Sequence, residues 1–481
     1  MSGSSSSVDT ADSAPIATVQ PPTEGLPEAE PSVIVAPPIE PKQMQRRVFR
    51  LAGPVIGENL LQTLLGIIDT LLVAGLGAAA LAGVGSSLQV IYIILAGMSA
   101  LAVGASVLVA QAVGAKQFAQ ASHLARQALI WSLLIAVPLT LVGLPLTPAL
   151  VGLLGLEGEV ALIATDYLAV NMGAIATLTI MLLASAVLRG AGDSRTPMLV
   201  TALTNVINVI LSWALIYGTL GLPTMGAVGS AWGTVISRGL GMILLVGVLW
   251  YGRNGVRVAG GSWRPSLAAV GAVLALGLPA ALEEVLVITA FAALTPIVAT
   301  LGTLELAAHR VAINLLSLSF LPGIGFGLAA TALVGQAVGA RRPDEARAAT
   351  KIALRWALIW MGGLGLIFVL FAQPLMRIFN DDPGLVASGA TALIAVALAQ
   401  PLWAATFVYG GALRGAGDTR SPLIITGSLN WIAVGLAFIL INLGLTQLWI
   451  VWAVFLVSGP IEAYLFYRTW RRIRLEEIAG G

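Results

Sequence analysis

Two carboxylates stand in a stretch that is otherwise almost wholly apolar, from Leu51 to Leu76. At about 1.5 Å per residue, this stretch is long enough to cross a bilayer as one helix. At about 100° per residue, Glu58 and Asp69 lie within about 20° of each other around that helix, and Gln62 falls on the same line. A carboxylate in hydrocarbon costs at least about 2.5 kcal/mol. We therefore expect this polar face to meet a water-filled cavity or a partner helix.

Other ionisable side chains also lie inside apolar runs, and acids outnumber bases among them. They are Glu283, Glu284, Arg238, Glu462 and Asp166. An excess of embedded acids favours a pathway that handles cations or protons. Arg238 and Glu462 lie at similar depths of two expected helices, and we interpret them as a structural charge pair before a substrate contact.

The composition is that of a polytopic membrane protein. The 481 residues are 58% hydrophobic and 10% charged, with a mean hydropathy of +0.93, whereas soluble domains are about 25% charged. The absence of cysteine excludes disulfides, thiolate metal clusters and thiol catalysis. No Ser/His/Asp constellation or metal-ligand cluster is visible, and the basic residues fall in short loops. We therefore expect neither an enzyme nor a nucleic-acid-binding protein.

Twelve apolar segments of spanning length follow one another, which predicts an all-α membrane protein. The segments exceed 20 residues and do not alternate, which favours helices over a barrel. If the N-terminus is cytoplasmic, 22 of the 25 Lys and Arg residues fall on the inner side. Arg310 and Arg377 fall outside and Arg238 within a helix. This asymmetry predicts a multi-pass protein of the cell membrane with both termini in the cytoplasm.

The second half of the chain repeats the first at a spacing of 225 residues. LVAQAVGAK, beginning at Leu108, returns as LVGQAVGAR at Leu333, and LRGAGDSRTP, beginning at Leu188, returns as LRGAGDTRSP at Leu413. Six helices per half is an even number, so both halves enter the membrane in the same direction. The fold class is therefore twelve transmembrane helices in two parallel six-helix lobes.

We divide the chain along this repeat. The expected parts are a disordered cytoplasmic tail at 1–44, a first lobe at 45–252, a cytoplasmic linker at 253–268, and a second lobe with a short cytoplasmic C-terminal tail at 269–481. The first tail is rich in Ser, Pro, Thr and acids, and it has no Lys or Arg before Lys42.

The repeated GAGD turns could be taken for phosphate-binding loops, but they lack the GK[ST] ending and follow a lipid-spanning helix. We interpret them as tight turns in which Asp193 and Asp418 pair with arginine or cap the next helix.

Two further features bear on coupling. Pro54 and Glu58 recur as Pro279 and Glu283, whereas Asp69 has no acidic counterpart in the second half. A proline kink near an ionisable group is a possible switch, which makes Pro54 a candidate hinge.

Thr204, Asn208 and Ser212 share one face of the fifth expected helix, and their counterparts in the second half are apolar. Such side chains can line a cavity or simply join helices, and the sequence leaves both roles open.

Together these motifs resemble the multidrug and toxic compound extrusion (MATE) family. The resemblance covers about residues 45–470 and rests on P-x14-D in the first helix, both LRGAGD motifs, GLPAALE, AAHRVAINLLSLSFLPGIGFG and LVGQAVGA. It implies export of organic cations and drugs in exchange for H⁺ or Na⁺, with no other cofactor. It also implies that Asp69 is the cation-linked carboxylate, that Pro54 bends its helix, and that Glu283 is an acid of the second lobe. From the residues themselves we add Glu58 as a coupling acid.

Five polar residues are the expected lining of the ion and substrate cavity. They are Gln62, Asn208, Ser212, Thr234 and Glu284. The resemblance matches Asn208 to the Asn of an N-x3-D pattern and Thr234 to a nearby polar position. Ser212 stands where that pattern has Asp, which leaves the coupling ion open.

The main hypothesis is a monomeric, cation-coupled exporter of small organic cations that works by alternating access in the lipid bilayer. The alternative from the wider superfamily is a flippase for a lipid-linked or amphipathic substrate. A flippase for anions needs basic cavity residues, and Arg238 is the one mid-membrane candidate. A channel is a third class, but two-lobe symmetry favours a rocking carrier.

Overall fold

The computed structural model describes residues 40–473 and 475, and in this part the chain forms fourteen helices. The first lobe contains α1 (Pro41–Ala74), α2 (Ala78–Gly114), α3 (Phe118–Leu153), α4 (Gly158–Gly173), α5 (Ile175–Gly190), α6 (Arg195–Tyr217) and α7 (Ala227–Tyr251). The second contains α8 (Leu267–Ala299), α9 (Thr303–Gly339), α10 (Pro343–Leu370), α11 (Ala372–Arg377), α12 (Pro383–Gly415), α13 (Arg420–Asn442) and α14 (Leu448–Arg472). Eleven single helices, together with the bent pair of α4 and α5, give twelve membrane spans. The twelve-helix, two-lobe prediction is confirmed.

The observed helix boundaries bear on two of the expectations, the N-terminal tail and the fourth span. Residues 1–39 of the expected tail lie outside the described residues, and α1 already begins at Pro41. The fourth span, expected as one helix, bends by 53° between α4 and α5. At this bend Thr140 of α3 donates a hydrogen bond of 2.9 Å to the carbonyl of Met172. A side chain that bonds a helix carbonyl in this way competes with the helix's own hydrogen bonds and allows a kink.

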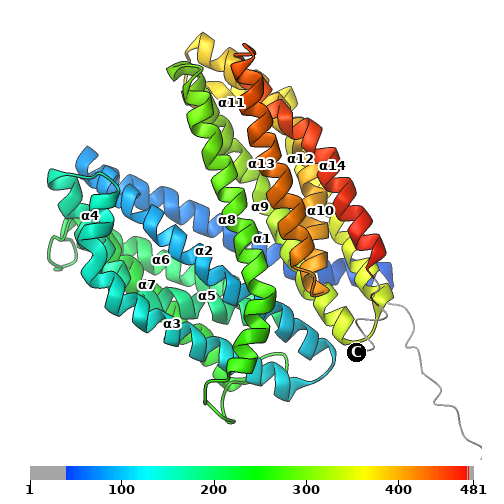
Figure 1. Ribbon diagram of the computed structural model, residues 1–481. Coiled ribbons are helices and arrows are strands. Elements are labelled where there is room, and N and C mark those ends of the chain that lie inside the picture. The colour runs from blue at the N-terminus through cyan, green and yellow to red at the C-terminus, as the bar shows by residue number, and fades with distance from the viewer. Residues whose placement is uncertain (1–39, 474, 476–481) are drawn as a thin grey trace, which may run out of the picture. The chain divides into compact units, whose positions relative to one another are not determined.

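Two helices pack on both lobes. The first part of α1 contributes four residues to the core of the second lobe: Met44, Val48, Leu51 and Ala52. Its last turns contribute Val73 to the core of the first lobe. In the same way α8 places Val270 and Val273 in the first lobe and Leu294 and Val298 in the second. Figure 1 shows α8 running from the helices of the second lobe to the ends of α2 and α3. Pro54 and Pro279 lie where these helices change lobes.

Close backbone contact joins α2 to α8. A Cβ on Gly277 would lie 1.6 Å from the carbonyl oxygen of Ala100, and one on Gly104 would lie 2.0 Å from that of Val273. These distances leave no room for any side chain. Small residues at such crossings are typical of helices that associate in lipid, where close packing replaces the hydrophobic effect.

The lobes are hydrogen-bonded to each other at one end of the bundle, which we call the linker end because residues 252–266 connect α7 to α8 there. Gln111 of α2 donates to the carbonyl of Gly415 at 3.1 Å, and Gln336 of α9 donates to the carbonyl of Gly190 at 3.0 Å. The two bonds are related by the 225-residue repeat. The repeated LVxQAVGA and LRGAGD motifs therefore form the contact between the lobes at this end.

The linker itself packs on the first lobe. Val256 and Val258 are fully buried, and Gln127 of α3 bonds both the carbonyl of Arg264 at 2.8 Å and the amide of Ser266 at 2.8 Å. The linker is thus held in place by α3 at both its apolar and its polar positions.

The turn before α6 confirms the capping role expected for its aspartate. Asp193 accepts hydrogen bonds from the amides of Arg195 and Thr196, each 3.1 Å long, and pairs with Arg253 at 2.7 Å. Burial disfavours its charge, but the bonds from Thr196 and Arg253 outweigh burial and lower the pKa of the carboxyl. In the second lobe Asp418 accepts from the amide of Ser421 at 2.9 Å.

Candidate functional site

Asp69 of α1 faces the interior of the first lobe. Its Oδ1 is buried and has no hydrogen-bond partner among the described residues. Arg238 of α7 is the charged group that acts on it, and the same guanidinium also acts on Tyr167 of α4. The expected pairing of Arg238 with Glu462 is therefore wrong, because α7 and α14 belong to different lobes and Arg238 is engaged within its own.

Glu58 has partners of its own, although it shares a face of α1 with Asp69. Arg189, at the end of α5, donates to Glu58 Oε2 at 3.1 Å, and Thr201 of α6 donates to Oε1 at 3.4 Å. Glu58 is 5% exposed and the Arg189 side chain is 18% exposed, so the ion pair is partly buried. Gln62, between the two acids, is exposed. The polar face thus divides into a partly buried ion pair, an exposed amide and a half-buried acid, Asp69.

Glu283 of α8 repeats the arrangement of Glu58. Arg414, at the end of α12, donates to Glu283 Oε1 at 2.7 Å, while Oε2 is buried without a hydrogen-bond partner in the described part of the chain. The two ion pairs are related by the 225-residue repeat. Sequence reasoning assigned both arginines to loops and missed these pairs. The signal was present, because Glu and Arg recur at the same spacing in both halves.

Glu462 of α14 is the second acid of this region. It is 4% exposed, and its Oε1 has no hydrogen-bond partner in the residues that the structure describes. It acts electrostatically on Glu283, and the side chain of Thr426 of α13 lies beside it. At the equivalent position of the first lobe stands Ser237, a neutral residue.

The polar side chains on one face of α6, the fifth span, join this helix to α7. Asn208 donates to Thr234 at 3.0 Å and to Ser237 at 3.3 Å, and it accepts from Ser212 at 3.2 Å. All four residues are buried. These contacts supply the joining role that the sequence left open, and a role in lining a cavity stays a prediction. Glu284 is exposed on α8.

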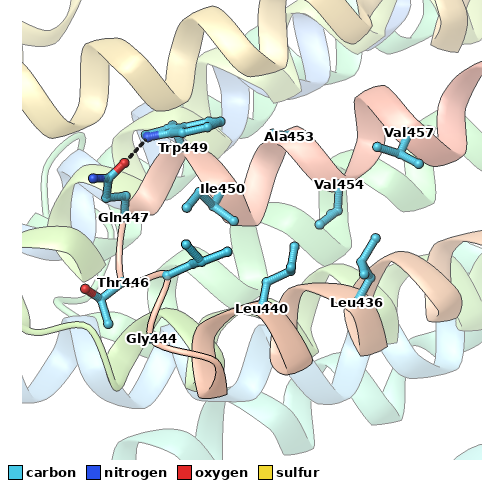
Figure 2. Close-up of a pocket in the computed structure, with 11 residues that line it drawn as sticks. Leu436, Leu440, Gly444, Thr446, Gln447, Trp449, Ile450, Ala453, Val454 and Val457 are labelled. Atoms are coloured by element: carbon cyan, nitrogen blue, oxygen red, sulfur yellow. Dashed lines mark hydrogen bonds between the residues drawn. The ribbon is translucent and has the colours of Figure 1, made fainter.

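A groove of about 420 Å³ lies between α13 and α14 (Figure 2). Leu436, Leu440 and Ile450 face it, and Trp449 donates a hydrogen bond to Gln447 at its rim. No acid or base lines it. Its chemistry suits hydrocarbon, and it holds none of the candidate coupling residues.

Comparison with known proteins covers both lobes. A family model described as MatE matches residues 54–214 and 279–439. A probable multidrug resistance protein NorM from Thermotoga maritima is 34% identical over 419 residues, which are 86% of this chain and 90% of the relative. The multidrug resistance protein NorM of Burkholderia vietnamiensis is 31% identical over 388 residues, 79% of this chain and 84% of that one.

Solved structures agree with these matches. A multidrug resistance MATE family transporter in an outward-facing conformation superposes with a TM-score of 0.82 at 25% identity, covering 90% of this chain and 96% of that one. A MATE structure in a bent conformation gives 0.83 at 25% identity and covers 92% and 99%. The similarity therefore extends over the whole helical bundle and both halves of the repeat.

Proposed function

Because the chain belongs to the MatE family of membrane transporters, we propose that it is a secondary active exporter of organic cations and drugs. Export is driven by exchange for H⁺ or Na⁺. The relatives named as multidrug resistance proteins support the substrate class. The protein works as a monomer in the cell membrane. The binding energies of ion and drug favour different conformations, and this difference drives exchange.

The observation that carries the proposal is the position of the buried acids on the two helices shared between the lobes. Glu58 follows Pro54 by four residues on α1, and Glu283 follows Pro279 by four residues on α8. Asp69 lies further along α1, with a buried oxygen that has no hydrogen-bond partner among the described residues. A cation bound at any of these carboxylates changes the charge on a helix that both lobes contact. Pro54 supplies the bend by which α1 responds.

We further propose that the linker end faces the cytoplasm, since the turns there carry most of the Lys and Arg residues. The hydrogen bonds of Gln111 and Gln336 join the lobes at this end. The conformation described is then closed toward the cytoplasm. Its similarity to an outward-facing transporter supports this assignment. The polar side chains Gln62 and Glu284, both exposed, are the proposed lining on the open side.

The flippase alternative has less support. An anionic headgroup needs a free basic side chain in the cavity, and Arg238 already acts with Asp69 and Tyr167. We therefore keep the cation exporter as the proposed function.

Transport into proteoliposomes under separately imposed H⁺ and Na⁺ gradients tests the proposal. We expect one gradient to drive ethidium, a fluorescent aromatic cation, against its concentration, and Asp69→Asn to abolish this coupling. Wild-type protein that moves ethidium under neither gradient would contradict the proposed function. Gradient-driven transport that persists in Asp69→Asn would remove Asp69 from the mechanism.

A further inference from the structure

A small pocket of about 250 Å³ lies between α10, α12 and α14 at the linker end of the second lobe. Helix α12 packs against both of the others. The side chains that give the pocket its chemistry are cationic or aromatic: Arg347, Lys351, Arg471, Tyr409, Tyr467 and Trp470. No Asp or Glu among the described residues lines it. The lining therefore favours a ligand with negative charge.

The size and charge of the pocket separate it from the transport pathway. Pockets for drug-sized molecules have volumes of about 300–1,000 Å³, so this one suits a smaller group. Its cationic side chains repel the organic cations of the proposed transport.

Arg471 is held in place by one of the lining tyrosines. Its Nη1 donates a hydrogen bond of 3.3 Å to the Tyr467 hydroxyl, and its guanidinium carbon lies 5.7 Å from the centre of the same ring. The Tyr467 ring lies 6.0 Å from that of Tyr409. A guanidinium fixed in this way keeps further N–H donors of the geometry that matches phosphate oxygens. The Tyr467 hydroxyl accepts from Arg471 and still has its own proton to donate.

The first lobe shows how a cation at this place is satisfied. The position equivalent to Lys351 in the 225-residue repeat is Arg126 of α3, which is 8% exposed. The linker lies against it: Arg126 donates to the carbonyl of Arg257 at 3.4 Å, and Ser122 accepts from the amide of the same residue at 3.0 Å. The first lobe thus supplies an oxygen acceptor from its own chain. Lys351 is exposed and has no ion pair with any of the described residues, so its acceptor can come from the membrane.

Toward the middle of the bundle, the helix faces that carry these cations become apolar. Leu354 lines the pocket one turn from Lys351, and Leu358, four residues further along α10, is 37% exposed. On α14, Tyr464 precedes Tyr467 by three residues and is 59% exposed. Residues three or four apart share a helix face. A ligand here meets cations at one end and apolar side chains at the other, which is the pattern of a phospholipid.

We infer that this pocket binds the phosphate-bearing headgroup of an anionic phospholipid, whose acyl chains lie along the exposed apolar faces of α10 and α14. Lys351, Arg471 and the Tyr467 hydroxyl hold the phosphate, and Tyr409 and Trp470 form the walls. Basic pockets between transmembrane helices are suited to anionic lipid headgroups, and Tyr and Trp favour the membrane interface. With the orientation proposed above, the lipid belongs to the inner leaflet. The binding itself does not depend on the proposed function.

Native mass spectrometry of the full chain, titrated in detergent with dioleoylphosphatidylglycerol, tests the inference by measuring each binding step. A Lys or Arg near an anionic lipid adds about fivefold in affinity. We therefore expect Lys351→Gln with Arg471→Gln to weaken the first step about 25-fold. The matched control is Arg195→Gln with Arg420→Gln, which removes two exposed arginines at the starts of α6 and α13 and should leave this step unchanged. Equal losses in the two double variants would overturn the inference, because surface charge alone would then explain binding.

Tyr467→Phe tests the pocket without a change of charge. It keeps the ring beside Arg471 and removes the hydroxyl, so we expect a loss of about fivefold, the size of one hydrogen bond. Lys351→Arg keeps the charge and should bind as wild type does. Phosphatidylglycerol binding that is unchanged in both Tyr467→Phe and the Lys351→Gln/Arg471→Gln double variant would overturn the inference.

Two other ligands identify the source of the phosphate. Dioleoylphosphatidylcholine has the same phosphodiester but no net charge, and we expect it to bind wild type and the Lys351→Gln/Arg471→Gln double variant equally. Inorganic phosphate at the lipid's concentration should not displace phosphatidylglycerol, because it has no acyl chains. Displacement by inorganic phosphate, or phosphatidylcholine bound as tightly as phosphatidylglycerol, would overturn the inference.

The chain itself has two acids soon after α14 in the sequence, Glu476 and Glu477. We expect Glu476→Gln with Glu477→Gln to leave the affinity for phosphatidylglycerol unchanged. A gain in affinity would show that these carboxylates compete for the cations of the pocket and would overturn its assignment to lipid. Because none of these titrations measures transport, a negative result leaves the proposed function standing.

Discussion

The two lobes share an ion pair and differ in what surrounds it. Each places a glutamate from its first helix against an arginine at the end of a later helix: Glu58 with Arg189 and Glu283 with Arg414. Around Glu58 the structure places Thr201, a neutral hydroxyl. Around Glu283 it places a further acid on α14. The ion pair is therefore common to both halves, while the acid on α14 is present in the second half alone.

A second difference concerns backbone shape. At equivalent places of the two lobes, Thr140 bonds the carbonyl of Met172 and the span breaks into α4 and α5, whereas Gly365 lies against the carbonyl of Ala397 and α12 continues without a break. A Cβ on Gly365 would come within 2.7 Å of that oxygen. The kinked span thus has a hydroxyl at this position, and the unbroken span has a glycine that allows close packing.

Substituting Arg189 or Arg414 has the largest expected effect, and that effect is on the stability of the protein. Breaking a buried ion pair costs about 3–5 kcal/mol, because the remaining charge stays buried. We expect Arg414→Ala to destabilise the protein more than Arg189→Ala, since Glu283 is left beside a second carboxyl. Thermal unfolding in detergent measures both. Adding Glu462→Gln should recover stability in Arg414→Ala and not in Arg189→Ala, and equal recovery in both would contradict the asymmetry.

Adding side chains at the contact between the lobes has the second largest expected effect. A Cβ on Gly114 would lie 2.0 Å from the carbonyl of Gln336, and one on Gly339 would lie 1.9 Å from that of Gln111. We expect Gly114→Ala and Gly339→Ala each to weaken closure of the linker end by about 1–3 kcal/mol. The equivalence of the two glycines predicts equal shifts toward the form that is open at this end.

The separation of the lobes can be measured with spin labels on introduced cysteines, because the chain has no cysteine of its own. Spin labels on Gln120→Cys and Asp344→Cys report the separation of the lobes at the linker end. Gly85→Ala, on α2, is the control, because its Cβ meets no atom within 4 Å. A shift in Gly85→Ala as large as that in Gly114→Ala would show that helix propensity, not closure, is responsible.

The smallest expected effect separates the two capping aspartates. Asp193 accepts hydrogen bonds from two backbone amides and from the Thr196 hydroxyl, and it pairs with the Arg253 side chain. Asp418 caps its helix through the amide of Ser421. We expect Asp193→Asn to cost about 1–2 kcal/mol at pH 7 and Asp418→Asn less.

The pH dependence follows from the lowered pKa of Asp193. Its stabilisation is complete above the pKa of an unfolded aspartate, about 3.9, and is lost as the pH falls through the lower folded value. The difference in melting temperature between wild type and Asp193→Asn should therefore shrink on acidification below pH 4. A difference that grows would contradict the sign of this shift.

Much of the fold was predictable because lipid imposes simple rules. Spans of about 20 apolar residues, their even number per half and the 225-residue repeat together required two parallel six-helix lobes. The acids at Glu58, Asp69 and Glu283 were also visible, since each is a rare exception to an apolar run. Their partners were not, because Arg189 and Arg414 are separated from their glutamates by 131 residues of chain.

The sequence by itself therefore determined the spans, their two-fold repetition and the presence of costly buried charge. Only the tertiary structure decided which charges are balanced. Arg238 acts on Asp69 within its own lobe, while Glu462 is acted on by Glu283 and has no ion pair with a base among residues 40–473. The physical reason is that an electrostatic interaction depends on distance and burial, and three helices far apart in the chain must pack before either quantity is defined.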